Sequence, residues 1–136
     1  MIKNNNIAVI NMLMQVRAVT TMHLPIGHSF IPYEMMLIVI LHYLNGEELT
    51  VKRLFNSGTF SEMGNRYHFR KLIEKDWIML KDHPSDSRLK LIVPAPKLLS
   101  SFEVISEELL RSFLNISEKH FGLTFTNNSS PASKEA

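Results

Sequence analysis

The sequence predicts a mainly helical protein with a small β-hairpin: a winged helix-turn-helix with a long helix on either side. The prediction rests first on the stretch from Leu49 to Val93, which reads LTVKRLFNSGTFSEMGNRYHFRKLIEKDWIMLKDHPSDSRLKLIV. A short helix, a tight turn, a second helix rich in cations and two strands joined by a polar turn fit this stretch in that order. It rests second on the strongly apolar helical segments that precede and follow the stretch.

Length and composition indicate one domain with a real core, since 45% of the 136 residues are hydrophobic. We expect a single winged-helix domain over residues 1–123, with its core at 32–94, and a disordered polar tail at 124–136. Residues 51–90 hold nine Lys or Arg against five Asp or Glu, a net charge of +4, whereas the rest holds six against eight, a net charge of −2. A basic middle with acidic flanks favours contact with a polyanion.

The residue types present exclude several kinds of chemistry. The absence of cysteine excludes disulfides, zinc ribbons and thiol catalysis. The six histidines are scattered, and the sequence contains no nucleophile elbow, phosphate loop or pair of catalytic carboxylates. We therefore expect no enzymatic activity, no catalytic residue, no metal and no cofactor. Because neither an export signal nor an apolar run of membrane length is evident, the cytoplasm is the expected compartment and no membrane contact is expected.

Two helices are expected before the central stretch. Asn4–Asn6 are predicted to cap a helix from about Ile7 to Met22. This helix is apolar on most sides, so it must be buried against more than one surface, which indicates a partner subunit. A second helix is predicted from Tyr33 to Leu44, closed by Asn45-Gly46. Its predicted core face consists of Tyr33, Met36, Leu37, Ile40, Leu41 and Leu44.

The helix-turn-helix itself is predicted over residues 50–75. Thr50 caps a short helix that ends near Asn56, and Ser57-Gly58 supplies the turn. Ser61 caps the second helix, which runs to about Lys75. The step of about 100° per residue divides the second helix into two faces. The predicted core face holds Asn65, Phe69, Leu72 and Ile73, with His68 at its margin.

The outer face of the second helix is the strongest functional signal. Arginine can donate two parallel hydrogen bonds to guanine in the major groove, and lysine or arginine can bind phosphate. The residues predicted to contact DNA on this helix are Ser61, Met63, Gly64, Arg66, Tyr67, Arg70 and Lys71. A glycine inside a helix costs about 1 kcal/mol. Its presence at position 64 is explained either by a close approach to another backbone or to DNA, or by ordinary tolerance. Lys52 and Arg53 on the preceding helix are expected to contact the DNA backbone.

The wing follows as two strands, Trp77–Lys81 and Leu89–Val93, around a polar turn at 82–88. Arg88 at the base of this hairpin is predicted to enter the minor groove, where negative potential attracts arginine. A last helix is predicted at about Lys97–His120, begun by prolines and stopped by a glycine. The apolar spacing of this helix, like that of the first, predicts dimerisation helices at about 7–22 and 97–121.

The run from Leu49 to Leu99 resembles the multiple-antibiotic-resistance regulator (MarR) family. Glu74-Lys75-Asp76-Trp77-Ile78 corresponds to the family's transition into the wing, with Asp76 in place of the usual glycine. Asp86-Ser87-Arg88 matches the Asp-x-Arg of the family's wing. The resemblance implies that Asp86 fixes the wing and that Arg88 reaches toward the minor groove. The sequence Leu-Thr-x-x-Gly that normally follows the wing is replaced here by Val93-Pro94-Ala95-Pro96-Lys97.

The resemblance implies a homodimer that binds pseudo-palindromic DNA and is joined through its terminal helices. Two recognition helices must then meet half-sites about one helical turn apart. The predicted function is a sequence-specific, double-stranded DNA-binding transcriptional regulator, with helix 61–75 in the major groove and wing 82–88 at the minor groove. The alternative to a dimer is that the terminal helices fold over the chain's own core. Two alternatives to the predicted function also stay open. One is a protein-interaction adaptor without specific DNA binding, and the other is a sensor that binds a small aromatic effector in a pocket between the dimer helices and the winged unit.

Overall fold

The computed structural model describes residues 2–58 and 60–122, without the side chains of residues 2 and 120, so the predicted tail at 124–136 lies outside the described residues. The elements in order are α1 (Ile2–His23), α2 (Phe30–Leu44), α3 (Val51–Ser57), α4 (Glu62–Glu74), β1 (Ile78–Asp82), β2 (Lys90–Pro94) and α5 (Pro96–Phe121). The two strands form one antiparallel sheet. The predicted fold class is therefore confirmed.

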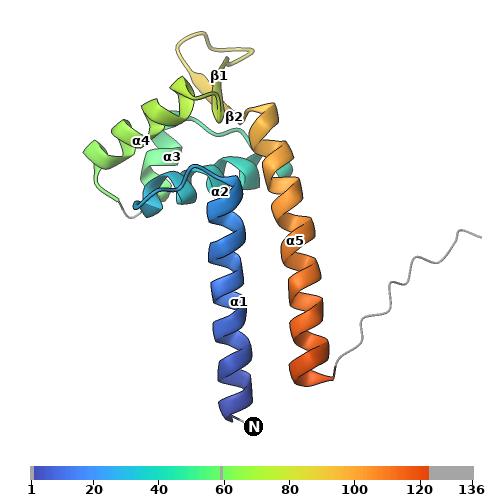
Figure 1. Ribbon diagram of the computed structural model, residues 1–136. Coiled ribbons are helices and arrows are strands. Elements are labelled where there is room, and N and C mark those ends of the chain that lie inside the picture. Colours follow the sequence, from blue (N-terminus) through green and yellow to red (C-terminus); the bar gives the residue numbers. More distant parts are fainter. Residues whose placement is uncertain (1, 59, 123–136) are drawn as a thin grey trace, which may run out of the picture.

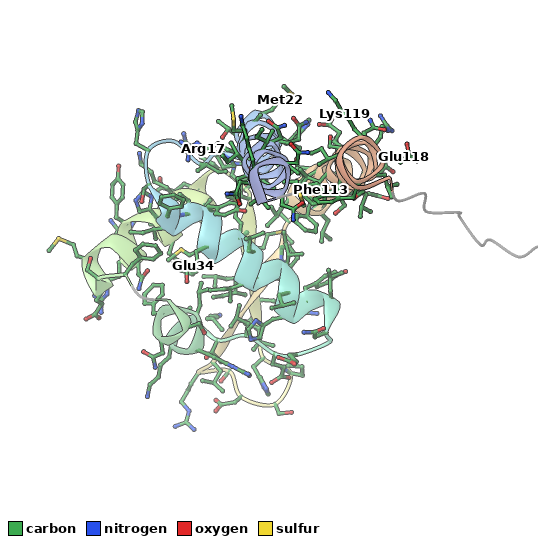
Figure 2. All side chains as sticks on the ribbon, turned by 90° about the horizontal axis from the view of Figure 1, so that it is seen from below. Arg17, Met22, Glu34, Phe113, Glu118 and Lys119 are labelled. Atoms are coloured by element: carbon green, nitrogen blue, oxygen red, sulfur yellow. The ribbon has the colours of Figure 1, made fainter. Side chains whose placement is uncertain are left out.

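The molecule has two parts. We call α2, α3, α4 and the hairpin the winged unit; α1 and α5 pack along each other and project from it (Figure 1). Figure 2 looks along α1 and α5, with Phe113 between the two helices and Glu118 on the side of α5 away from α1. Within the described ranges, no helix combines the length and hydropathy that a membrane crossing requires.

Helix α1 begins before the predicted capping residues. Asn4–Asn6 lie inside the helix, so the prediction that they cap it is wrong. Asparagine is a poor helix former, but this is only a weak local preference, and all three residues are exposed within the first turns of α1. Helix α2 also begins earlier than predicted, at Phe30, because Ser29 accepts a hydrogen bond from the amide of Ile31 at 3.2 Å.

The core lies where α2 meets the hairpin, α4 and the adjoining parts of α1 and α5. The largest fully buried side chains belong to Met36, Val39, Leu49, Ile78, Leu98 and Ile105. The predicted core face of α2 is partly wrong: Met36 and Ile40 are buried, whereas Leu41 and Leu44 are exposed. On a helix that is apolar nearly all round, sequence spacing allows two adjacent stripes, and the contacts of α2 bury the one with Met35 and Val39.

The hairpin is tied to the entrance of the helix-turn-helix. The strands pair from Ile78 opposite Pro94 to Asp82 opposite Lys90, one residue later than predicted. The amide of Ile92 donates to the carbonyl of Leu49 at 2.8 Å, beside an isolated bridge between Thr50 and Leu91. The start of α3 is thus fixed to β2 by backbone hydrogen bonds.

Helix α4 ends in a Schellman turn, and this explains the one-residue shift of β1. The amide of Trp77 donates to the carbonyl of Leu72 at 2.9 Å, and that of Asp76 to the carbonyl of Ile73 at 3.1 Å. Asp76 consequently has a φ of +59°, in the left-handed region that favours glycine. Gly46 occupies the equivalent place after α2, with a φ of +67°. The position where the family usually has glycine is therefore one that requires positive φ.

Candidate nucleic-acid interface

Helix α4 has the two faces that the sequence predicts. Asn65 and Leu72 are buried, and His68, Phe69 and Ile73 are partly buried. The opposite side, which we call the outer face of α4, consists of Met63, Arg66, Tyr67, Arg70 and Lys71. All five are exposed, and 83% of Met63 is accessible to solvent. The predicted division into a core face and an exposed face is confirmed.

Local hydrogen bonds and aromatic packing fix α4 against α3. Ser61 caps α4 by accepting a hydrogen bond from the amide of Gly64 at 3.2 Å. The buried side-chain amide of Asn65 donates to the carbonyls of Phe55 and Phe60, both at 3.4 Å. The rings of Phe55 and Phe69 pack edge to face with centroids 5.5 Å apart. The outer face is thereby held on a rigid support.

Gly64 packs against α2. A Cβ atom on Gly64 would lie 2.8 Å from Cδ1 of Ile31 and 3.2 Å from Oγ of Ser61. Of the two explanations left open for this glycine, the contact fits a close approach, but to a side chain of this chain's own helix α2 rather than to another backbone. A side chain at position 64 would have to displace Ile31, and the predicted contact of Gly64 with DNA stays a prediction.

Two of the three cations on the outer face contact side chains of α4 itself. The guanidinium of Arg66 lies 2.6 Å from a carboxylate oxygen of Glu62, one turn earlier. The ammonium of Lys71 lies 4.9 Å from the centroid of the Tyr67 ring, and its interaction with the Tyr67 side chain raises the pKa of Lys71. Burial, and secondly the positive charge of Lys71, lower the pKa of His68. The positive charge of this helix therefore resides on Arg66, Arg70 and Lys71.

The two predicted contact residues on α3 differ in their surroundings. Lys52 is exposed on the first turn of the helix. The backbone of Arg53 donates to the capping Thr50 at 3.2 Å, and its guanidinium donates to the carbonyl of Glu48 at 3.4 Å. The same guanidinium lies 3.9 Å from a carboxylate oxygen of Glu47. Arg53 is thus tied to residues 45–50, which we call the α2–α3 connection.

Two side chains make hydrogen bonds within the wing, and the sequence pointed to only one of them. Asp86 accepts hydrogen bonds from the backbone amide of Arg88 at 3.0 Å and from its Nε at 3.3 Å, and its role in fixing the wing stays a prediction. The missed residue is His83, whose Nδ1 accepts from the amides of Ser85 at 3.0 Å and Asp86 at 3.1 Å. A histidine followed by Pro-Ser-Asp was an available local signal for a side chain that caps a turn.

Arg88 is the last residue of the predicted site. The side chain of Arg88 is 90% exposed, and the wing projects away from the free ends of α1 and α5 (Figure 1). Lys90 pairs with Asp82 across the two strands. Among the residues that the structure describes, no group of three His, Asp or Glu side chains is placed to hold a metal ion.

A groove of about 510 Å³ lies between the α1–α2 loop and α4. Its walls combine apolar residues of segment 25–32 with Tyr67, Lys71, Lys75 and Trp77. The ammonium of Lys97 lies 4.4 Å from the Trp77 ring centroid, and Lys97 also donates to the carbonyl of Lys75 at 2.5 Å. The groove is therefore an apolar and aromatic surface with cations at its edge.

Comparison with solved structures decides the fold. The transcriptional regulator PA4135 matches with a TM-score of 0.57 at 14% identity, over 82% of this chain and 76% of that one. Wild-type MarR (apo form) from E. coli matches with a TM-score of 0.55 at 10% identity, over 84% of this chain and 80% of that one. The chain has a MarR-type winged-helix fold.

AbsC, a MarR family transcriptional regulator from Streptomyces coelicolor, has the same fold: its TM-score is 0.53 at 13% identity, over 88% of this chain and 72% of that one. No protein-family model matches the sequence, and neither does any curated protein. The resemblance stated from residues 49–99 is thus confirmed as a MarR-type fold. In that fold α4 is the second helix of the helix-turn-helix, and the hairpin is the wing.

Proposed function

We propose that this protein is a sequence-specific, double-stranded DNA-binding transcriptional regulator that acts as a homodimer. In this proposal α4 occupies the major groove, and the wing at residues 82–88 lies at the minor groove. The observation that carries the proposal is the outer face of α4, where three cations are exposed opposite a buried face on a MarR-type fold. It is supported by the fact that PA4135 and AbsC, which share the fold, are transcriptional regulators.

Arg66 and Arg70 are the residues that we expect to recognise bases. Arg66 must exchange its contact with Glu62 for a contact with guanine. An exposed ion pair one helical turn apart stabilises a helix by about 0.3–0.5 kcal/mol. A bidentate contact with the correct base discriminates by about 1–3 kcal/mol. The exchange is therefore favourable, and Lys52 and Lys71 add phosphate contacts that carry no sequence information.

The homodimer is supported by apolar side chains that α1 and α5 leave exposed. On α1 these are Ile7, Val9, Ile10, Leu13, Met14 and Met22, and on α5 they are Val104, Leu110, Leu114 and Phe121. The terminal helices pack on each other and still expose this surface, so folding over their own core does not bury it. A soluble monomer rarely exposes apolar surface of this extent. A second copy would cover it and place two α4 helices on adjacent half-sites.

Titration of duplex DNA at several salt concentrations tests the proposal. We expect binding that weakens steeply with salt, because phosphate contacts release counterions. Selection from random duplexes should give a two-fold symmetric sequence, and Arg66→Ala or Arg70→Ala should relax the preference at one base position of each half-site. Lys119→Ala is the matched control, since it removes a cation in the last turn of α5, at the end that lies away from the winged unit (Figure 1). Failure of the wild type to bind any duplex at micromolar concentration and low salt would favour the adaptor function instead.

A second candidate function, sensing of a small aromatic effector, is favoured by the groove beside Trp77. An aromatic acid there would contact Trp77 and pair its carboxylate with Lys71 or Lys75. Because Lys71 also belongs to the outer face of α4, such a ligand would compete with DNA. A thermal-shift screen of aromatic acids on the wild type and on Lys75→Gln tests this function. A shift that Lys75→Gln removes would support it, and a flat screen would exclude it for this class of ligand.

A further inference from the structure

His83 connects the wing to the α2–α3 connection. Its Nδ1 accepts two backbone hydrogen bonds inside the wing, from Ser85 at 3.0 Å and from Asp86 at 3.1 Å. Its Nε2 lies 3.2 Å from a carboxylate oxygen of Glu48. Only 18% of the His83 side chain is exposed, against 62% for Glu48. One imidazole therefore joins the turn of the wing to a residue thirty-five positions earlier.

The chemistry of imidazole fixes which nitrogen of His83 carries the proton. A backbone amide can only donate, so Nδ1 must present its lone pair to both amides and cannot bear a hydrogen. The proton of the neutral ring then resides on Nε2, where it is donated to the carboxylate of Glu48. The other neutral tautomer and the doubly protonated ring would each point an N–H at the two amide hydrogens. The observed wing is compatible with one protonation state of His83.

The path from His83 to the exposed arginine of the wing is short. Asp86, whose amide is held by His83, uses its carboxylate to hold the amide and Nε of Arg88. On the other side, Glu48 precedes Leu49, whose carbonyl accepts from Ile92 in β2. The wing is thus attached to the start of the helix-turn-helix at its base through Leu49 and at its turn through Glu48.

We propose that His83 is the positioning residue of the wing: neutral and protonated on Nε2, it couples Glu48 to Asp86 and so sets the direction of Arg88. This inference rests on the proposed function, because the direction of Arg88 matters only if the wing contacts DNA. The contact partner is the minor-groove edge of duplex DNA that flanks each half-site. His83 itself touches no nucleotide and acts through Arg88.

Nitrogen-detected NMR of the histidine side chains tests the protonation state without DNA. We expect the His83 Nδ1 signal at the position of an unprotonated ring nitrogen and the Nε2 signal at that of a protonated one. The amides of Ser85 and Asp86 should exchange slowly with solvent, and His83→Ala should accelerate both by about 10-fold or more, since each loses its acceptor. A protonated Nδ1, or unchanged exchange in His83→Ala, would overturn the proposal.

Conservative variants separate positioning from general folding. Glu48→Gln keeps an oxygen that accepts from Nε2, so the Ser85 and Asp86 amides should stay protected, whereas Glu48→Ala should expose them. Glu47→Ala is the matched control: Glu47 is the neighbouring anion of the same connection, but it faces His42 and Arg53. If Glu47→Ala and Glu48→Ala had equal effects on the two amides, the specific path through Glu48 would be wrong.

A double-mutant cycle with Arg88 tests the route to DNA. We expect Arg88→Ala and His83→Ala each to weaken binding of the selected duplex by about 10-fold, and the double variant to be no weaker than Arg88→Ala alone. Independent, multiplying losses would show that His83 does not act through Arg88. If the wild type binds no DNA, the proposed function fails while the NMR results still decide whether His83 orders the wing.

Discussion

The winged unit and the α1–α5 pair are stabilised in different ways. In the winged unit the chain supplies its own partners: Thr50 and Ser61 cap α3 and α4, and His83 and Asp86 hold the wing. The α1–α5 pair is long and internally packed, yet it leaves residues such as Leu13 exposed by 64%. Both parts expose apolar side chains, Leu44 of the winged unit by 66% for example, but only the winged unit shows this network of caps and turn hydrogen bonds. Under the proposed function, each chain supplies one recognition unit and the α1–α5 surfaces join two chains on the DNA.

The largest effect is expected from breaking the α1–α5 surface. Leu13→Glu combined with Leu110→Glu places charges on residues that are exposed by 64% and 63% in the single chain. These changes should leave the fold intact but separate the copies, because a buried unpaired carboxylate strongly disfavours association. Loss of bivalent binding should weaken affinity for the full site by about 100-fold or more.

Analytical ultracentrifugation and DNA titration measure the two halves of this prediction. Asn4→Glu, a charge added at an exposed polar position of α1, is the control and should leave both mass and affinity unchanged. A double variant that remains dimeric, or a wild type that is monomeric at high concentration, would contradict the assignment of this surface.

The next effect concerns the winged unit alone. Arg70→Ala should lose about 1–3 kcal/mol of discrimination at one base position, while Lys52→Ala should weaken all duplexes alike and reduce the salt slope by about 1. The difference follows from the placement of Arg70 on the outer face of α4 and of Lys52 on the first turn of α3. Binding of a panel of single-base-pair variants of the selected site measures both; equal profiles for the two variants would refute the separation of roles.

A smaller effect is expected at the two Schellman turns of the winged unit. Asp76 has a φ of +59°, where a side chain is disfavoured by about 1 kcal/mol, so Asp76→Gly should raise the free energy of unfolding by about that amount. Gly46→Asp places the same strain after α2 and should lower it by a similar amount. Denaturation in urea measures both changes. Two shifts of the same sign would show that the backbone conformation is not the cause.

The contact of α4 with α2 should appear as a coupling of a few tenths of a kcal/mol between Gly64 and Ile31. Ile31→Val removes Cδ1, the atom that a Cβ on Gly64 would approach to 2.8 Å. In the wild type this change should destabilise the fold by about 0.5–1.5 kcal/mol. Ile31→Val should destabilise the Gly64→Ala variant less, because the alanine Cβ would already have displaced the Cδ1 atom that Ile31→Val removes. Additive free energies of unfolding would show that Gly64 is not required by this contact.

The smallest effect is a pH dependence from His68. Burial and Lys71 lower the pKa of His68 below its ordinary value of 6.5, so the unfolded chain binds this proton more readily than the folded one. The neutral His68 ring therefore makes its full contribution to the free energy of unfolding above pH 6.5. This contribution is lost as the pH falls through the lowered pKa of the folded state. His68→Leu should flatten the fall in unfolding free energy below pH 6.5, which urea denaturation at a series of pH values measures. An unchanged slope in His68→Leu would contradict the sign.

The sequence predicted what depends on local signals. The caps Thr50 and Ser61, the two faces of α4 and the order of elements follow from side-chain chemistry within a few residues. It failed where a local preference is weak or a distant partner decides: the low helix propensity of Asn4–Asn6 does not delay the start of α1, and the contacts of α2 bury Val39 rather than Leu41. The contact of Glu48 with His83 was equally beyond a sequence argument, because it joins two turns that only the hairpin brings together.

The proposed function requires that two copies of this chain bind one duplex, each through the outer face of α4. Hydroxyl-radical footprinting of the wild type on a selected duplex tests it most directly. We predict two protected segments related by two-fold symmetry, with centres about one helical turn apart, and weaker protection outside them that Arg88→Ala removes. A single protected segment, or uniform weak protection that ignores sequence, would contradict the account.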